Sequence, residues 1–99
     1  MLEQSRSSAQ YFDYNEARET LVKRPFERRI EAIRSYKYET GGVYEGFWKG
    51  NMRHRQGKMR WPNGASYEGS WEYNQASGKG KFTEPGGGLY DGTWVNGKS

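Results

Sequence analysis

The stretch "YEGFWKGN" at residues 44–51 decides the fold, because the chain repeats it at a fixed interval. "YEGSWEYN" begins at residue 67 and "YDGTWVNG" at residue 90, so the interval is 23 residues both times. A match of this kind at a fixed period indicates a repeat architecture. The positions that define the repeat are aromatic residues, glycines and prolines, namely Tyr44, Gly46, Trp48, Gly57, Pro62, Gly64, Tyr67, Gly69, Trp71, Gly80, Pro85, Gly87, Tyr90, Gly92 and Trp94.

Each copy reads as a two-stranded hairpin. Alternation along "YEGFW" places Tyr44, Gly46 and Trp48 on one face of a strand. The second strands are predicted at "GKMRW" (57–61) and "GKFTE" (80–84), followed by the turn sequences "PNG" (62–64) and "PGGG" (85–88). An aromatic ring on a neighbouring strand can cover the gap that a strand glycine leaves. Because a lone hairpin is unstable in water, we expect the hairpins to form one continuous antiparallel sheet with its Tyr and Trp side chains on one side.

The chain divides by composition near residue 41. All 14 glycines lie at or after this position, as do ten of the 16 aromatic residues. We therefore expect residues 41–99 to form the repeat sheet and residues 1–40 to form an N-terminal docking segment of helical or extended structure.

A first helix is predicted through "EARETLVK" (16–23). Asp13 or Asn15 can cap it, and a proline at position 25 predicts that it ends near Lys23. Tyr14 and Leu21 are expected to share one face of this helix.

A second helix is predicted over "PFERRIEAIRSYK" (25–37). Phe26, Ile30 and Ile33 would form one narrow apolar stripe, which makes this segment a candidate partner helix. The stripe must cover something, either the chain's own sheet or a groove in another protein. Glu27 and Glu31 argue against a membrane-surface helix.

The composition limits the possible classes of protein. Of the 99 residues, 32% are hydrophobic and half of those are aromatic, so the core must be built from rings. There is no cysteine, which excludes disulfides and thiolate metal sites and fits a reducing compartment. No apolar run is long enough to span a membrane or to serve as a secretory signal. The net charge of +4 permits attraction to anionic surfaces without requiring it.

The pattern Tyr-Glu-Gly-x-Trp, followed by Asn or Gly and then by Gly-Lys-x-x-x-Pro-x-Gly, resembles the MORN repeat. The resemblance covers residues 43–98, with two full units and the start of a third. It implies a mainly β fold, an open-ended antiparallel sheet of stacked hairpins, which a short helical segment precedes here. It also implies no catalytic activity. Arg55 stands where the family usually has a glycine, and Glu84 where it usually has an aromatic residue.

The recurring carboxylates are interpreted as structural. Glu45, Glu68 and Asp91 occupy equivalent positions, whereas general acid/base catalysis needs two differently tuned groups. Cross-strand pairing with Lys58 and Lys81 is their expected role.

Neither a metal nor a cofactor is predicted. His54 is the only histidine and has no companions at ligand spacing, so it is read as an exposed turn residue. "GKGK" (78–81) and "PGGG" lack the spacing of a phosphate-binding loop.

A basic cluster marks the first unit and is a candidate site for lipid or another anion. It could be a solvated or protein-contacting face, a reader of acidic lipid headgroups, or a surface for single-stranded nucleic acid, the last being disfavoured because no nucleic-acid motif accompanies it. Its members are Lys49, Arg53, Arg55, Lys58 and Arg60.

These patterns favour a non-enzymatic scaffold or assembly module that binds other proteins in a larger complex. The alternatives are a peripheral membrane module for acidic phospholipids and a regulatory part of a larger enzyme. The uncapped last strand offers self-association through an open sheet edge. The resemblance implies an intracellular, cytoplasmic setting associated with the cytoskeleton, a cilium or a membrane.

Overall fold

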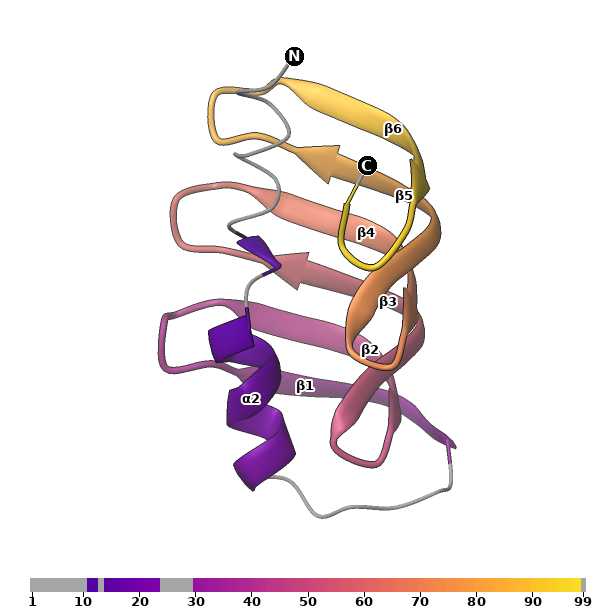
Figure 1. Cartoon of the computed structure of the whole chain (residues 1–99). Helices are drawn as coiled ribbons and strands as arrows, with labels where there is room; N and C mark the ends of the chain where they lie inside the picture. Colours follow the sequence, from indigo (N-terminus) through magenta and orange to yellow (C-terminus); the bar gives the residue numbers. More distant parts are fainter. Residues whose placement is uncertain (1–10, 13, 24–29, 99) are drawn as a thin grey trace.

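A computed structural model describes residues 11–12, 14–23 and 30–98. One short helix, α2, precedes a single six-stranded antiparallel sheet whose spatial order, β1-β2-β3-β4-β5-β6, follows the sequence (Figure 1). The predicted mainly β, open-ended array of hairpins and the first predicted helix are confirmed. The elements are α2 (Tyr14–Lys23), β1 (Ile30–Lys37), β2 (Val43–Lys49), β3 (Met52–Arg60), β4 (Ser66–Glu72), β5 (Gln75–Thr83) and β6 (Leu89–Trp94).

The loops that link one hairpin to the next share one geometry. The Tyr38 N–H donates to the Gly42 carbonyl at 2.7 Å, and the Gly41 N–H donates to the Tyr38 carbonyl at 2.9 Å. The same two bonds recur 23 and 46 residues later. Gly41, Gly64 and Gly87 have φ values of 99°, 96° and 102°, a left-handed conformation that glycine adopts without a steric cost. The structural repeat therefore begins before the first unit that the sequence reveals.

A row of glycines crosses the sheet from strand to strand. A side chain at Gly46 would overlap the Cα atom of Gly57, and one at Gly57 would overlap the Tyr44 hydroxyl. Tyr44 thus covers the gap as expected, and its hydroxyl donates to the Phe47 carbonyl at 2.6 Å. The row consists of Gly46, Gly57, Gly69, Gly80 and Gly92, each opposite the next.

The aromatic side chains that flank this row form the core. Tyr44, Trp48, Tyr67 and Trp71 are buried and meet edge to face, with ring centroids 4.9–5.4 Å apart. The Trp71 indole N–H donates to the Gly57 carbonyl at 3.1 Å. Burial raises the pKa of the Tyr44 and Tyr67 hydroxyls, which keeps them protonated as donors. The ladder of Tyr and Trp on one side of the sheet is as predicted.

The second predicted helix is wrong over residues 30–37, because this segment is strand β1 and pairs with β2. Ile30 and Ile33 lie on that strand, Ile33 is 63% exposed, and Phe26 lies outside the described residues. The physical reason is a period of 2 further along the segment. Tyr36 and Tyr38 point into the aromatic core, and burying two rings outweighs a narrow stripe on a helix.

Strand β1 is a degenerate second strand of a preceding repeat unit. Arg34, Tyr36 and Tyr38 precede Gly57, Met59 and Trp61 by 23 residues. Tyr36 lies opposite Tyr44 as Met59 lies opposite Tyr67. The arginine in place of the glycine hides this copy from a search for the repeat.

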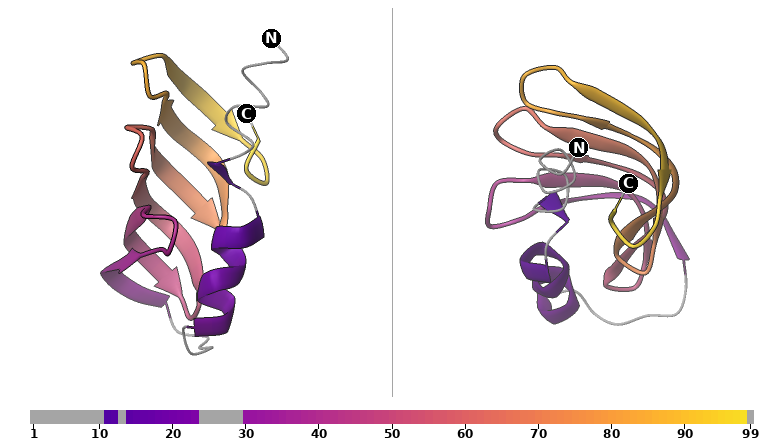
Figure 2. Two further views of the ribbon diagram at one scale, coloured as in Figure 1. Left: turned by 90° about the vertical axis from the view of Figure 1, so that its left-hand side faces the viewer. Right: turned by 45° about the horizontal axis from the view of Figure 1, so that its top comes forward.

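Helix α2 lies across one face of the sheet, between the row of linking loops and the row of hairpin turns, both of which curl toward it (Figures 1 and 2). Leu21, expected on a shared face with Tyr14, is exposed. Among the α2 side chains that the structure describes, the buried ones are Glu16 and Thr20, one helical turn apart, so this part of the helix meets the sheet through polar side chains. We call this side of the sheet the concave face.

Candidate functional site

The concave face holds helix α2 by its backbone. The Asn51 side-chain amide donates to the Leu21 carbonyl at 3.2 Å, and the Asn74 amide donates to the Ala17 carbonyl at 3.1 Å. These asparagines occupy the same position in successive units. Their acceptors are four residues apart, which is about one turn of an α-helix. The repeat therefore supplies evenly placed amide donors to a helix, whatever side chains that helix carries.

A buried carboxylate adds the charged contact between α2 and the sheet. Glu16 accepts hydrogen bonds from the Trp61 indole N–H at 3.2 Å and from the Thr40 hydroxyl at 2.8 Å. Its Oε1 atom lies 4.0 Å from Nη1 of Arg53, and both side chains are almost fully buried.

Arg53 is enclosed by the sheet and the helix. It is 2% exposed, and its Nε and Nη2 groups donate to the side chain and the carbonyl of Asn74 at 2.8 and 3.1 Å. Its guanidinium carbon lies 4.5 Å from the ring centroid of Trp71 and 5.4 Å from that of Tyr38. Arg53 cannot reach a lipid headgroup, so its placement in an anion-binding cluster is wrong.

Tyr11 and Phe12 also pack on the concave face. The Tyr11 ring centroid lies 4.8 Å from that of Trp61, and the Tyr11 hydroxyl accepts a hydrogen bond from the Asn63 amide at 2.6 Å. Phe12 contacts rings from both full units and from the third. Its centroid lies 5.4–5.7 Å from those of Trp61, Tyr67, Trp71 and Trp94. Tyr11 and Phe12 thus cover part of the aromatic surface of these units.

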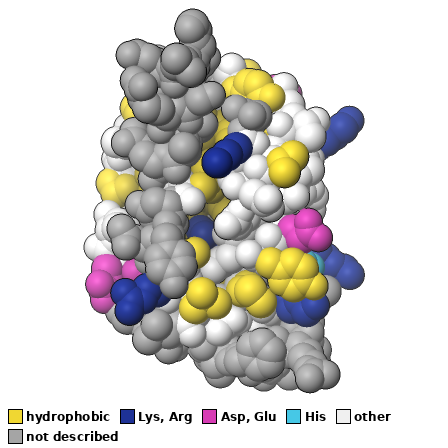
Figure 3. Space-filling model, viewed as in Figure 1, with side chains coloured by type: hydrophobic (Ala, Val, Ile, Leu, Met, Phe, Trp, Pro, Cys, Tyr) yellow, Lys and Arg dark blue, Asp and Glu magenta, His cyan; other side chains and the backbone are white. Residues whose placement is uncertain are grey.

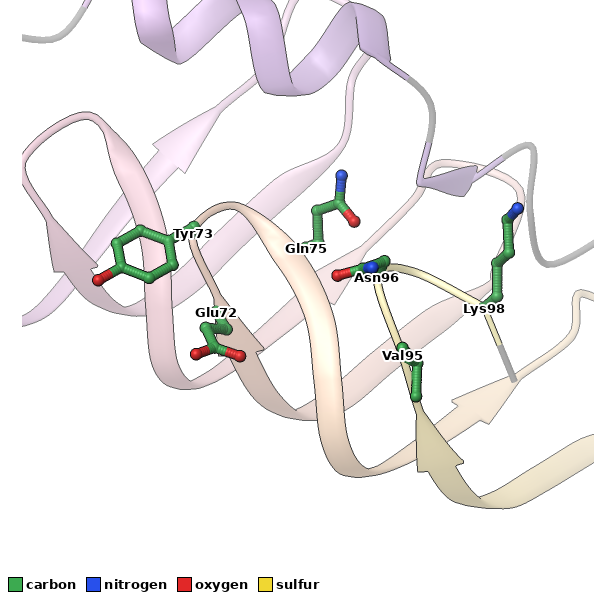
Figure 4. Close-up of a pocket in the computed structure, with 6 residues that line it drawn as sticks. All are labelled: Glu72, Tyr73, Gln75, Val95, Asn96 and Lys98. Atoms are coloured by element: carbon green, nitrogen blue, oxygen red, sulfur yellow. The ribbon is translucent and has the colours of Figure 1, made fainter.

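A second surface lies at the turn end of the sheet, between the β4–β5 turn and the turn after β6 (Figure 4). An open hollow of about 950 Å³ separates these two turns. Tyr73 and Val95, which line it, are 51% and 62% exposed. Its lining combines apolar, amide and oppositely charged side chains from Glu72, Tyr73, Gln75, Val95, Asn96 and Lys98.

His54 lies half-buried on strand β3, so its interpretation as an exposed turn residue is wrong, and it contacts the β4–β5 turn beside this hollow. Its Nδ1 atom accepts a hydrogen bond from the Tyr73 N–H at 3.1 Å, and the two ring centroids are 4.8 Å apart. Lys49 donates to the Tyr73 hydroxyl at 3.2 Å. Burial, and then the nearby charge of Lys49, lowers the pKa of His54, with a smaller opposing effect from Glu72. In Figure 3 hydrophobic, basic and acidic side chains lie together at the right-hand side of the molecule.

One row of charges crosses the outer face of the sheet with alternating sign. Lys58 lies opposite Glu45 on one side and Glu68 on the other, and Lys81 lies opposite Glu68 and Asp91. This register makes the predicted Lys–carboxylate neighbours adjacent across the strands.

The predicted basic cluster is divided by the structure. Lys58 and the exposed Arg60 lie on the outer face, Lys49 and Arg55 lie near His54, and Arg53 is internal.

In the parts of the chain that the structure describes, no three His, Cys, Asp or Glu side chains gather as metal ligands would. The helix in this described part is too short to cross a bilayer.

The repeat geometry agrees with comparison against protein families. The MORN repeat pattern matches residues 44–66, 67–88 and 90–99. The chain belongs to the MORN repeat family. MORN repeats are generally associated with protein or membrane binding and are typically non-catalytic. No curated protein matches the sequence.

Proposed function

We propose that this MORN protein is a non-enzymatic assembly module that binds other proteins within a larger complex, in a cytoskeletal or ciliary setting. The observation that carries the proposal is the set of contacts between the concave face and α2. Side-chain amides at repeated positions donate hydrogen bonds to helix carbonyls, and aromatic rings of the sheet pack against the ring of Phe12. This is the chemistry of a protein-binding surface rather than of a reaction centre.

The turn-end hollow is the proposed contact for a partner, because the N-terminal segment already covers the concave face. An exposed aromatic ring beside an exposed valine, flanked by Glu72 and Lys98, is the mixture that protein interfaces use. The family's general association with protein or membrane binding supports a binding role.

Capture from a detergent-free native extract tests this function. Tagged wild type is compared with Tyr73→Ser/Val95→Ser, and Ile33→Ser serves as control because it removes an equally exposed apolar side chain at the far edge of the sheet. We expect a defined set of proteins that the double variant loses and the control retains. Identical capture by all three proteins would contradict the proposed contact.

Binding to acidic phospholipid is the second candidate, favoured by Lys58 and Arg60 on the outer face. The alternating carboxylates weaken it, because they cancel much of the positive potential that an anionic membrane attracts. Vesicles containing phosphatidylserine provide the test. Recovery of the protein at low salt that disappears at high salt, and that Lys58→Glu abolishes, would favour the membrane function instead.

A further inference from the structure

The two edges of the sheet belong to different strand types. Inside the array, first strands of a unit (β2 and β4) alternate with second strands (β3 and β5), and each type pairs only with the other. Strand β6 is a first strand and β1 is a second strand. The β6 edge of one copy therefore has the strand type that could pair, head to tail, with the β1 edge of another copy.

The internal pairing of β4 with β5 gives the register that such a contact would adopt. It sets Tyr67 opposite Phe82 and Gly69 opposite Gly80. The ring of Tyr67 crosses onto β5 and lies over Gly80, where an added Cβ atom would overlap the Tyr67 hydroxyl. In a head-to-tail contact the corresponding pairs are Tyr90 with Tyr36 and Gly92 with Arg34.

Arg34 is the residue that does not fit this register. Gly57 and Gly80 occupy its position in the later units, and each lies under the tyrosine of the preceding strand. In its own sheet Arg34 pairs with Gly46 of β2, and β1 is the outermost strand on its other side. An arginine is tolerated at this position because β1 is the first strand of the described sheet, so that sheet has no preceding strand to supply the crossing tyrosine.

We propose that Arg34 closes the β1 edge to a second copy of this chain, so that the sheet accepts an added strand at β6 and not at β1. An incoming β6 strand would bring Tyr90 onto the Cβ atom and side chain of Arg34. The β6 edge retains Tyr90, Gly92 on the same strand and the exposed apolar side chain of Leu89. Its fitting partner is an extended strand with a glycine opposite Gly92 and an aromatic residue two positions later. A charged residue at a sheet edge is a known means of preventing edge-to-edge association.

The variant Arg34→Gly gives the β1 strand the glycine that a strand pairing with β6 requires. Residues 34–36 would then read Gly-Ser-Tyr, with a glycine two positions before an aromatic residue as in the Gly-Lys-Phe of residues 80–82. Light scattering after size-exclusion chromatography, over a concentration series, measures the outcome. We expect wild type to keep its monomer mass of 11.5 kDa. The mass of Arg34→Gly should rise with concentration to more than about twofold, since a head-to-tail contact does not close on itself.

Two further variants distinguish edge pairing from other association. Arg34→Ala retains a Cβ atom and should behave as wild type. Gly92→Ala, added to Arg34→Gly, should restore the monomer, because a side chain at the equivalent Gly69 overlaps the Cα atom of the facing glycine. Near-ultraviolet circular dichroism of the buried rings confirms that each variant is folded. The proposal is overturned if wild type already assembles through these edges, if folded Arg34→Gly stays monomeric, or if Arg34→Ala assembles as Arg34→Gly does.

Discussion

The carboxylate of Glu16 is the most informative single group to remove, because it joins α2 to three different parts of the sheet. Glu16→Ala deletes the acceptor for Trp61 and Thr40 and leaves Arg53 buried without its counter-charge. Breaking a buried ion pair from one side costs about 3–5 kcal/mol. The separation of 4.0 Å is long, and Arg53 keeps its bonds to Asn74, so we expect the lower end, about 3 kcal/mol.

That loss is a large share of the 5–15 kcal/mol by which small domains are stable. Glu16→Gln keeps an acceptor for one donor while losing the charge, and should cost less, about 1–2 kcal/mol. Arg18→Ala is the matched control, because Arg18 is exposed on the same helix and its removal should change stability by under about 0.5 kcal/mol. Urea unfolding followed by tryptophan fluorescence gives the free energies. A loss below about 1 kcal/mol for Glu16→Ala would refute the reasoning and leave the asparagine and ring contacts as what holds α2.

Three further predictions concern the sheet. Gly80→Ala should destabilise by about 1–3 kcal/mol, since the added methyl overlaps a tyrosine ring, whereas Gly86→Ala, with open space around it, should be nearly neutral in the same urea titration. Arg55→Gly should stabilise the protein by about 0.5–1 kcal/mol. Arg55 has a φ of 65°, and a non-glycine residue in this left-handed conformation costs about 1–2 kcal/mol, a gain on substitution that the backbone entropy of glycine partly offsets. An unchanged melting temperature in thermal unfolding would contradict this prediction. His54 has a lowered pKa in the folded state, so its contribution to stability is complete above its unfolded pKa of about 6.5 and is lost as the pH falls through the folded pKa. Urea midpoints from pH 7 to 5 should therefore drop more for wild type than for His54→Gln, and equal drops would show that its bond to Tyr73 is not sensitive to pH.

The sheet was predictable because its stabilising contacts recur at one period. Tyr44, Gly46 and Trp48 are informative only together. The tyrosine ring needs the space beside a glycine, and that space must be filled by an aromatic ring. Three appearances of that combination decide strand type and turn placement, whereas the register comes from the structure. Where one member is replaced the signal disappears. This is why Arg34 concealed β1 and why the apolar stripe of Phe26, Ile30 and Ile33 suggested a helix. Testing the period backward from Trp61 to Tyr38 and from Gly64 to Gly41 would have found the strand.

The contacts of the concave face were less predictable, because they join residues that no local pattern relates. Arg53 reads as one more surface cation in a basic stretch, and only the fold places two rings and Asn74 around it. Glu16 reads as a solvated helix residue for the same reason. The asparagines were visible at equal repeat positions, yet nothing in the sequence indicates that their amides meet the carbonyls of an N-terminal helix.

Intramolecular occupation of the concave face determines where this protein can meet others. A partner helix aimed at the same rings would have to displace Phe12 and Tyr11, and also the Glu16 contacts, whose loss alone we expect to cost about 3 kcal/mol. The partner's apparent affinity is reduced in proportion to the small fraction of molecules in which the N-terminal segment has left the concave face. The turn-end hollow and the β6 edge carry no such penalty, because their apolar side chains are already exposed. At the β1 edge Arg34 replaces the glycine that a crossing tyrosine requires, whereas the β6 edge supplies the tyrosine itself, so partner binding should be directional, with the β1 end closed.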